Sequence, residues 1–155
     1  MSYGNIYAHM AGLKSYVETN LPARLNQVET EIGATIADIA DHVLGYRDTL
    51  TANHYPCAFY VASSGTPEES AQHGEWFALE ADIVIAYRAS TPEALETALL
   101  AYSDAVRNLV GADESLGGLC DVAQITYIDW YHGAAMEKDK GVVVVSITMR
   151  TELRT

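Results

Sequence analysis

The stretch Glu75–Arg88 (EWFALEADIVIAYR) decides the fold of this chain of 155 residues. From Leu79 onward its residues alternate between two sets, one mostly apolar and one more polar. A period of two is typical of a strand with one face buried and the other partly wet, as in an antiparallel sheet covered on one side. The expected buried set is Leu79, Ala81, Ile83, Ile85 and Tyr87, and the other set is Glu80, Asp82, Val84, Ala86 and Arg88.

A helix is predicted over Thr91–Val110. Thr91 offers a capping hydroxyl, Pro92 fits the first helical position, and Glu93 lies near the positive end of the helix dipole. Gly111 is the expected C-cap. The predicted buried stripe is Leu95, Leu99, Tyr102, Val106 and Leu109.

The rest of the C-terminal half predicts a turn and two more strands. Gly117-Gly118 is most simply a tight turn, and strands are expected over Asp121–Tyr131 and Gly141–Leu153. The β-branched run Val142–Val145 indicates that the last strand is central in the sheet and buried on both sides near its start.

The N-terminal part is helical by its apolar spacing, with two stripes separated by a proline. Pro22 predicts a kink or a fresh helix start, and Gly33 is a plausible stop. We interpret Ala34–Asn53 as an irregular arm, although part of it keeps a helical spacing. The stripes are Ile6, Met10, Leu13 and Val17, then Leu21, Leu25, Val28 and Ile32.

Between the arm and the alternating strand lie one short strand and one loop. Pro56–Ala62 (PCAFYVA) is aromatic and β-branched, as in a strand. Ser63–Gly74 is polar and contains Gly and Pro, so we expect a long loop there.

Together these elements predict an α+β fold. An N-terminal helix or helices and one long helix would pack on one face of a mainly antiparallel sheet of about four strands. We expect a single domain over 1–155, with a helical part at 1–33, an irregular arm at 34–54, and the sheet plus helix at 55–155.

The formal net charge is −12, from 21 acidic and 9 basic side chains. Such a surface repels phosphate, so we expect no specific contact with nucleic acid, although DNA can pass an acidic wall without sticking. No apolar run approaches the roughly 20 residues of a membrane span, and the N-terminus shows no signal-peptide pattern. Cys57 and Cys120 are expected to be buried small hydrophobes.

No residue pattern predicts a catalytic, metal or cofactor site. The five histidines show no zinc spacing and are interpreted as solvent-facing loop residues: His9, His42, His54, His73 and His132. Glu80 and Asp82 project from one strand face about 7 Å apart, and Arg88 shares that face, which favours a solvated or subunit-facing surface over acid–base chemistry. Candidate interface residues are Arg47, Asp48, Glu68, Glu69, Glu80, Asp82 and Arg88. The aromatic cluster Tyr127, Trp130 and Tyr131 favours packing in a core or an interface.

Six stretches carry a family resemblance: Leu21–Leu25 (LPARL), Tyr55–Val61 (YPCAFYV), Glu80–Ile85 (EADIVI), Tyr102–Val106 (YSDAV), Asp113–Gly118 (DESLGG) and Ser146–Thr151 (SITMRT). In this order they resemble the tail terminator (tail completion) proteins of long-tailed bacteriophages. The resemblance covers most of the chain. No single stretch is a signature, and Ala34–Asn53 departs from the pattern.

The resemblance implies a structural virion protein, made in the host cytoplasm, that is not an enzyme. It implies a homo-oligomeric ring, a hexamer by that resemblance, which caps the tail tube and joins it to a head–tail connector or neck protein, with DNA passing through the lumen. Two alternatives remain. One is another neck or tail component, such as a connector or tube subunit. The other is a small metal-dependent hydrolase using Glu80, Asp82 and His73.

Overall fold

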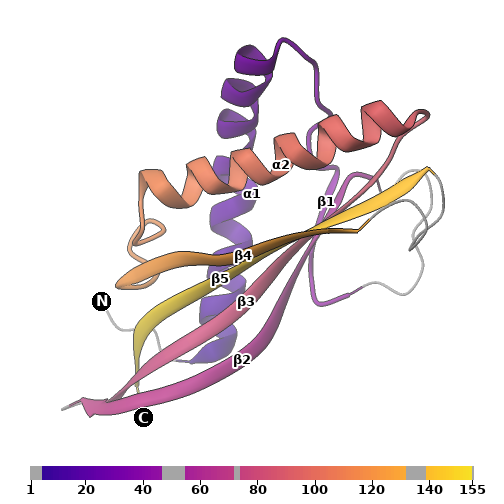
Figure 1. Cartoon of the computed structure of the whole chain (residues 1–155). Helices are drawn as coiled ribbons and strands as arrows, with labels where there is room; N and C mark the ends of the chain where they lie inside the picture. The colour runs from indigo at the N-terminus through magenta and orange to yellow at the C-terminus, as the bar shows by residue number, and fades with distance from the viewer. Residues whose placement is uncertain (1–4, 47–54, 72–73, 132–138, 155) are drawn as a thin grey trace.

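The computed structural model describes residues 5–46, 55–71, 74–131 and 139–154. Two helices pack on one face of a five-stranded sheet with the order β1-β2-β3-β5-β4 (Figure 1). β1 runs parallel to β2, and the other neighbouring pairs are antiparallel. The elements are α1 (Ile6–Ile32), β1 (Asp41–Leu44), β2 (Cys57–Ala71), β3 (Gly74–Arg88), α2 (Pro92–Ala112), β4 (Val122–Tyr131) and β5 (Lys140–Arg154).

The predicted fold class is confirmed, with one strand more than expected. The side chains of β3 alternate between the two faces of the sheet as predicted, and one set lies in the main core under the helices. Val84 and Ala86 lie on the other face, in a smaller apolar cluster with Cys57 and Phe59. The helix-free face is therefore apolar at one end and polar at the other.

α1 is one continuous helix, so Pro22 neither ends it nor begins a second one. Proline removes one backbone N–H from the helix, but most of the stripe residues on both sides of Pro22 are buried, and that burial holds the two halves in line. Ile6 and Ile32, at the outer ends of the two predicted stripes, are instead exposed. Gly33 ends the helix as predicted. It adopts φ 69° and its N–H donates to the Glu29 carbonyl oxygen at 2.9 Å.

The prediction of an irregular arm at 34–54 is only partly confirmed, because this segment contains β1, the strand that was not expected. Residues Asp41–Leu44 form β1, which pairs with Cys57–Tyr60 of β2. Four residues are too few to show an alternating pattern, so the sequence gives no strand signal here. Arg47 and Asp48 lie outside the described residues.

The prediction of a loop at 63–74 is wrong. β2 continues through it to Ala71 and pairs with β3. Beyond Tyr60 no described strand lies on the outer side of β2, so its polar residues and Pro67 sit on a free edge, where proline is tolerated. Gly65 is required by packing, since a Cβ there would lie 2.4 Å from Cζ of Phe77.

α2 runs past the predicted cap at Gly111 and ends at Ala112, with Asp113 as its C-cap. Leu116, Gly117 and Gly118 then have φ of 51°, 70° and 87°. The Asp113 carboxylate holds this turn, since it accepts the Ser115 N–H at 3.0 Å, the Ser115 hydroxyl at 2.6 Å and the Gly117 N–H at 2.9 Å. The predicted turn is confirmed.

Asp113→Asn is expected to lower the melting temperature at pH 7, because the amide turns a donor toward the Gly117 N–H. Hydrogen bonds from the Ser115 hydroxyl, then from the Gly117 and Ser115 N–H groups, lower the pKa of Asp113 below its ordinary 3.8. A lowered folded-state pKa stabilises the fold above about pH 3.8 and loses that effect as the pH falls through the folded-state value. Thermal unfolding at pH 7 and pH 2.5 should show the deficit shrinking in acid. An equal deficit at both pH values would contradict this role.

Val145→Asp should abolish soluble folding, because Val145 is 0% exposed in the core under the helices and an unpaired carboxylate there costs several kcal/mol. Val144→Asp is the matched control. Val144 lies on the other face and is only partly buried, so the expected burial of this strand on both sides is wrong there. Val144→Asp should therefore lose less stability than Val145→Asp. Soluble yield and urea unfolding measure both variants, and the opposite ranking would contradict the assigned faces.

Candidate assembly surface

The predicted interface residues of β3 lie on the helix-free face, but each has a partner within the chain. Glu80 accepts a hydrogen bond from the Ser64 hydroxyl at 3.0 Å, and Asp82 accepts one from the buried hydroxyl of Ser146. Asp82 therefore satisfies a buried hydroxyl of β5, and Glu80 ties β3 to β2. The two carboxylates act as separate structural groups.

Two more of the predicted charges, Arg88 and Glu68, also form contacts within the chain. Arg88 pairs with Asp139 at 2.6 Å, and Glu68 pairs with Arg150 at 2.6 Å. The Arg150 guanidinium also lies 5.1 Å from the centre of the Trp76 ring, so it joins β2, β3 and β5 near the end of the hairpin. The side chain of Glu69 lies outside the described set.

Two histidines differ from the prediction of solvent-facing loop residues. His9 lies in α1 and is fully buried, with Nδ1 2.9 Å from the Asn5 carbonyl oxygen and Nε2 3.0 Å from the Thr151 hydroxyl. His42 lies in β1, partly buried, with Nδ1 2.7 Å from the Tyr60 hydroxyl, and burial lowers the pKa of this imidazole. His54, His73 and His132 lie outside the described residues.

In the described part of the chain, no group of three or more His, Cys, Asp or Glu side chains is arranged to hold a metal ion. Cys57 and Cys120 are buried, as predicted, and no disulfide joins them. Burial raises the pKa of Cys120 to about 12. No helix among residues 5–46 and 92–112 has the length and hydropathy of a membrane span.

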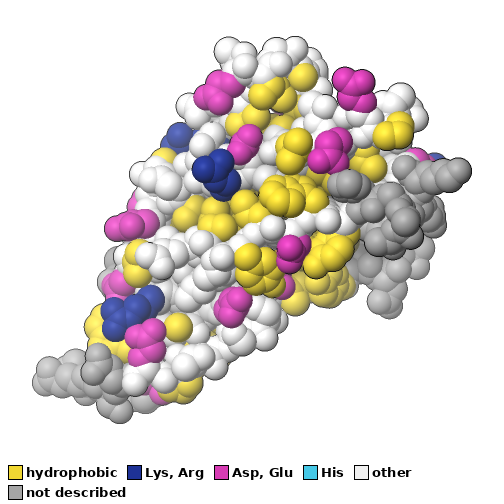
Figure 2. Space-filling view, in the orientation of Figure 1, with side chains coloured by type: hydrophobic (Ala, Val, Ile, Leu, Met, Phe, Trp, Pro, Cys, Tyr) yellow, Lys and Arg dark blue, Asp and Glu magenta, His cyan; other side chains and the backbone are white. Residues whose placement is uncertain are grey.

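Four of the exposed large apolar side chains among the described residues lie on β4 and α2. Figure 2 shows hydrophobic side chains along these two elements, with acidic side chains among them. We call this group, with the acidic residue inside it, the β4 surface. Its members are Leu100 (43% exposed), Tyr127 (47%), Asp129, Trp130 (42%) and Tyr131 (45%).

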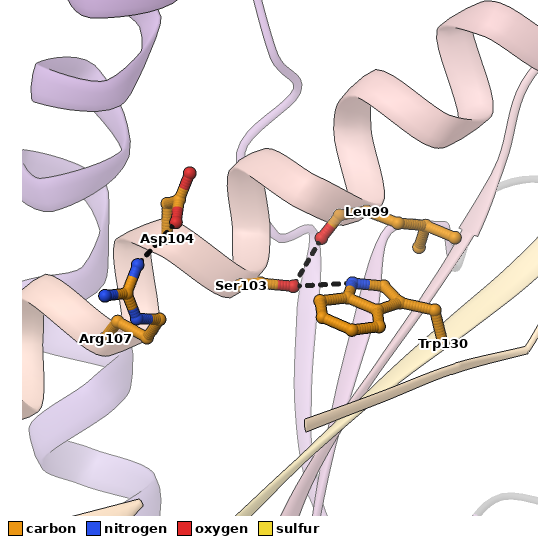
Figure 3. A network of polar contacts seen from close by, with 5 residues as sticks. All are labelled: Leu99, Ser103, Asp104, Arg107 and Trp130. Atoms are coloured by element: carbon orange, nitrogen blue, oxygen red, sulfur yellow. Dashed lines mark hydrogen bonds and ion pairs between the residues drawn. The ribbon is translucent and has the colours of Figure 1, made fainter. Parts of the chain in front are cut away.

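A short hydrogen-bond chain fixes the β4 surface to the core. The Trp130 indole N–H donates to the Ser103 hydroxyl at 2.9 Å, and that hydroxyl donates to the Leu99 carbonyl oxygen at 2.8 Å (Figure 3). Ser103 is only 3% exposed, so the chain reaches from the surface into the packed side of α2. Asp104 and Arg107, 3.0 Å apart, form an ion pair on the next turn of the helix.

Two smaller groups of exposed apolar side chains lie elsewhere in the described residues. On β1 and just after it are Leu44 (39% exposed) and Tyr46 (65%), with the Tyr46 ring 5.7 Å from that of Phe59; we call this pair the β1 surface. At the start of α1 are Ile6 (41%) and Tyr7 (70%), which we call the α1 start. Sequence analysis found the β4 aromatics, but it missed the other two groups because single exposed apolar residues give no periodic signal.

Asp82→Ala should lower the free energy of unfolding by about 1–3 kcal/mol, because it leaves the buried Ser146 hydroxyl without its acceptor. Glu80→Gln is the control and should change it by less than about 0.5 kcal/mol, since its contact with Ser64 is exposed. Urea unfolding compares the two. Equal, negligible effects would argue that both carboxylates are free for another task.

No protein-family model matches this chain, and no curated protein matches it. Among solved structures, it is similar in fold to a chain described as "Virion of native gene transfer agent (GTA) particle". The two chains are 14% identical, the match covers 88% of this chain and 94% of the other, and the TM-score is 0.46. A likeness at this level carries no argument about function.

Proposed function

We propose that this chain is a structural protein of a phage-like virion and, within it, a tail terminator that closes a ring on the end of the tail tube. Support comes from the sequence resemblance described above. The observation that carries the proposal is the presence of several separate exposed apolar groups on one small subunit. These are the β1 surface, the α1 start and the β4 surface.

A ring of identical subunits needs two different, complementary surfaces on each copy, and it stops growing when it closes. The β1 surface and the α1 start belong to different elements and can serve as the two halves of such a contact. A terminator must also touch the tube below and the neck above. The β4 surface is then available to bind a different protein, such as one of these two.

The charge of −12 fits a ring through which DNA passes, since an acidic wall does not bind phosphate. The same charge makes the copies repel one another at low salt. We therefore expect ring closure to become easier as ionic strength rises, because screening weakens repulsion while apolar contacts persist.

The test is the assembly state, measured by native mass spectrometry and negative-stain electron microscopy at low and high salt. A closed ring is expected, a hexamer by the family resemblance. A strictly monomeric chain that is also absent from purified tails would refute the proposal. Long filaments would favour the rival reading as a tube subunit.

Tyr46→Ala and Tyr7→Ala should each block ring closure without unfolding the subunit, because both side chains are more than half exposed. Each variant keeps one intact surface. A mixture of the two should therefore give dimers and nothing larger. Thr30→Ala, on the exposed side of α1, is the matched control and should still form rings. Rings formed by either tyrosine variant would place the contact elsewhere.

A further inference from the structure

The two outer edges of the sheet are not equivalent. On one side, β1 has only four residues, and beyond it β2 carries Pro67 and two register shifts. Short edge strands, prolines and bulges are the features by which proteins prevent unwanted strand pairing. On the other side, β4 has ten residues, no proline and one register shift, between Ile125 and Tyr127.

In the described chain, β4 pairs with no strand other than β5. Near the start of β4 the Ala123 N–H donates to the Glu114 carbonyl oxygen at 2.6 Å, so the open part of its outer edge lies beyond Ala123. Alternate side chains turn to the two faces of the strand. Ile128 packs on the main core and Trp130 bonds to α2. Tyr127, Asp129 and Tyr131 therefore stand on the helix-free face. The open edge is flanked by aromatic rings on both sides.

Two carboxylates, Asp129 and Asp82, lie near this edge. The negative charge of Asp129 raises the pKa of Tyr131, with a smaller contribution from Asp82, so these groups share one neighbourhood. Neither Asp129 nor Asp82 forms an ion pair with a described residue. The arginines of the same face, Arg88 and Arg150, are engaged with Asp139 and Glu68.

We propose that β4 accepts an extended segment of a partner protein, rich in lysine or arginine, as a sixth strand of the sheet. Backbone hydrogen bonds to an open edge supply affinity, and alternate side chains supply specificity. A cationic side chain laid beside Asp129 gains an ion pair, and the faces of Tyr127 and Tyr131 add cation–π attraction.

The charge also separates this occupant from the other candidates. A second copy brings a net charge of −12 to an edge that is already acidic, and nucleic acid brings phosphates. The bond between Trp130 and Ser103 holds the edge strand against α2 before any partner arrives, so little ordering is needed on binding. This inference does not depend on ring closure.

The experiment uses Trp130 as its reporter. The chain has two tryptophans, so Trp76→Phe leaves Trp130 alone. The probe is a capped ten-residue peptide that alternates arginine and valine. Binding should shift Trp130 emission to the blue, and tighter binding is expected at low salt. The same peptide with every backbone amide methylated keeps the charges but lacks the donors, and it should not bind. A glutamate–valine peptide should not bind either.

Two variants locate the site. Asp129→Asn should weaken binding of the arginine peptide about tenfold and flatten its salt dependence, and Tyr131→Ala should weaken it several-fold. Glu31→Gln removes one acid from the exposed face of α1 and should leave binding unchanged. Circular dichroism confirms that all three remain folded.

No blue shift with the arginine peptide would overturn the proposal, and so would equal binding of the methylated peptide or of the glutamate peptide. Self-association without peptide that buries Trp130 and is lost in Tyr131→Ala would assign the edge to a second copy instead. Ring closure is measured separately through Tyr7 and Tyr46, so failure of the ring and failure of this edge are distinguishable.

Discussion

The apolar layer between the two helices and the paired strands β3 and β5 is the constraint on which the rest of the structure depends. These strands pair over fifteen positions, from Gly74 with Arg154 to Arg88 with Lys140. Their helix-side residues are almost all buried under α1 and α2. Burial of this layer is the main favourable term, since apolar contact area supplies most of the stability of a domain. β2 pairs with the outer side of β3, β4 pairs with the outer side of β5, and β1 pairs with β2.

A few polar side chains fasten the helices to this layer at fixed points. Tyr102, fully buried in α2, donates to the Ala37 carbonyl oxygen at 2.6 Å and meets the Tyr87 ring edge-on at 5.9 Å. His9 links α1 to Thr151 at the far end of β5. No buried side-chain N or O atom in the described residues lacks a hydrogen-bond partner. These bonds specify one arrangement of helices on sheet, because an alternative packing would leave the same groups unpaired.

The sequence correctly predicted the elements that have a periodic apolar pattern or a helix-capping residue. The alternation of β3, the Thr91 cap and the glycine stop at Gly33 all appear in the structure. It failed where another part of the chain decides the local structure. Four residues become β1 only because β2 lies beside them, and the polar half of β2 is a strand only because β3 pairs with it. Local composition cannot report a partner that lies farther along the chain.

The same limit applies to the candidate surface. The sequence places Glu80 and Asp82 on one face, but their partners Ser64 and Ser146 come from other strands. The aromatic cluster of β4 is visible in the sequence. The hydrogen bond that fixes Trp130 joins residues 27 positions apart, and no spacing rule connects an indole to a serine in a helix. Such a contact depends on how α2 crosses the sheet.

The strand order has a consequence for how the chain is made. β5 comes after every other described strand, yet it lies between β3 and β4. While the ribosome is still producing that last segment, the earlier strands have no central neighbour, and β4 has no strand to join. The nascent polypeptide can form α1 and the local β2–β3 hairpin, whereas cooperative closure waits for the final stretch to emerge. The complete sheet therefore forms only after β5 has been synthesised.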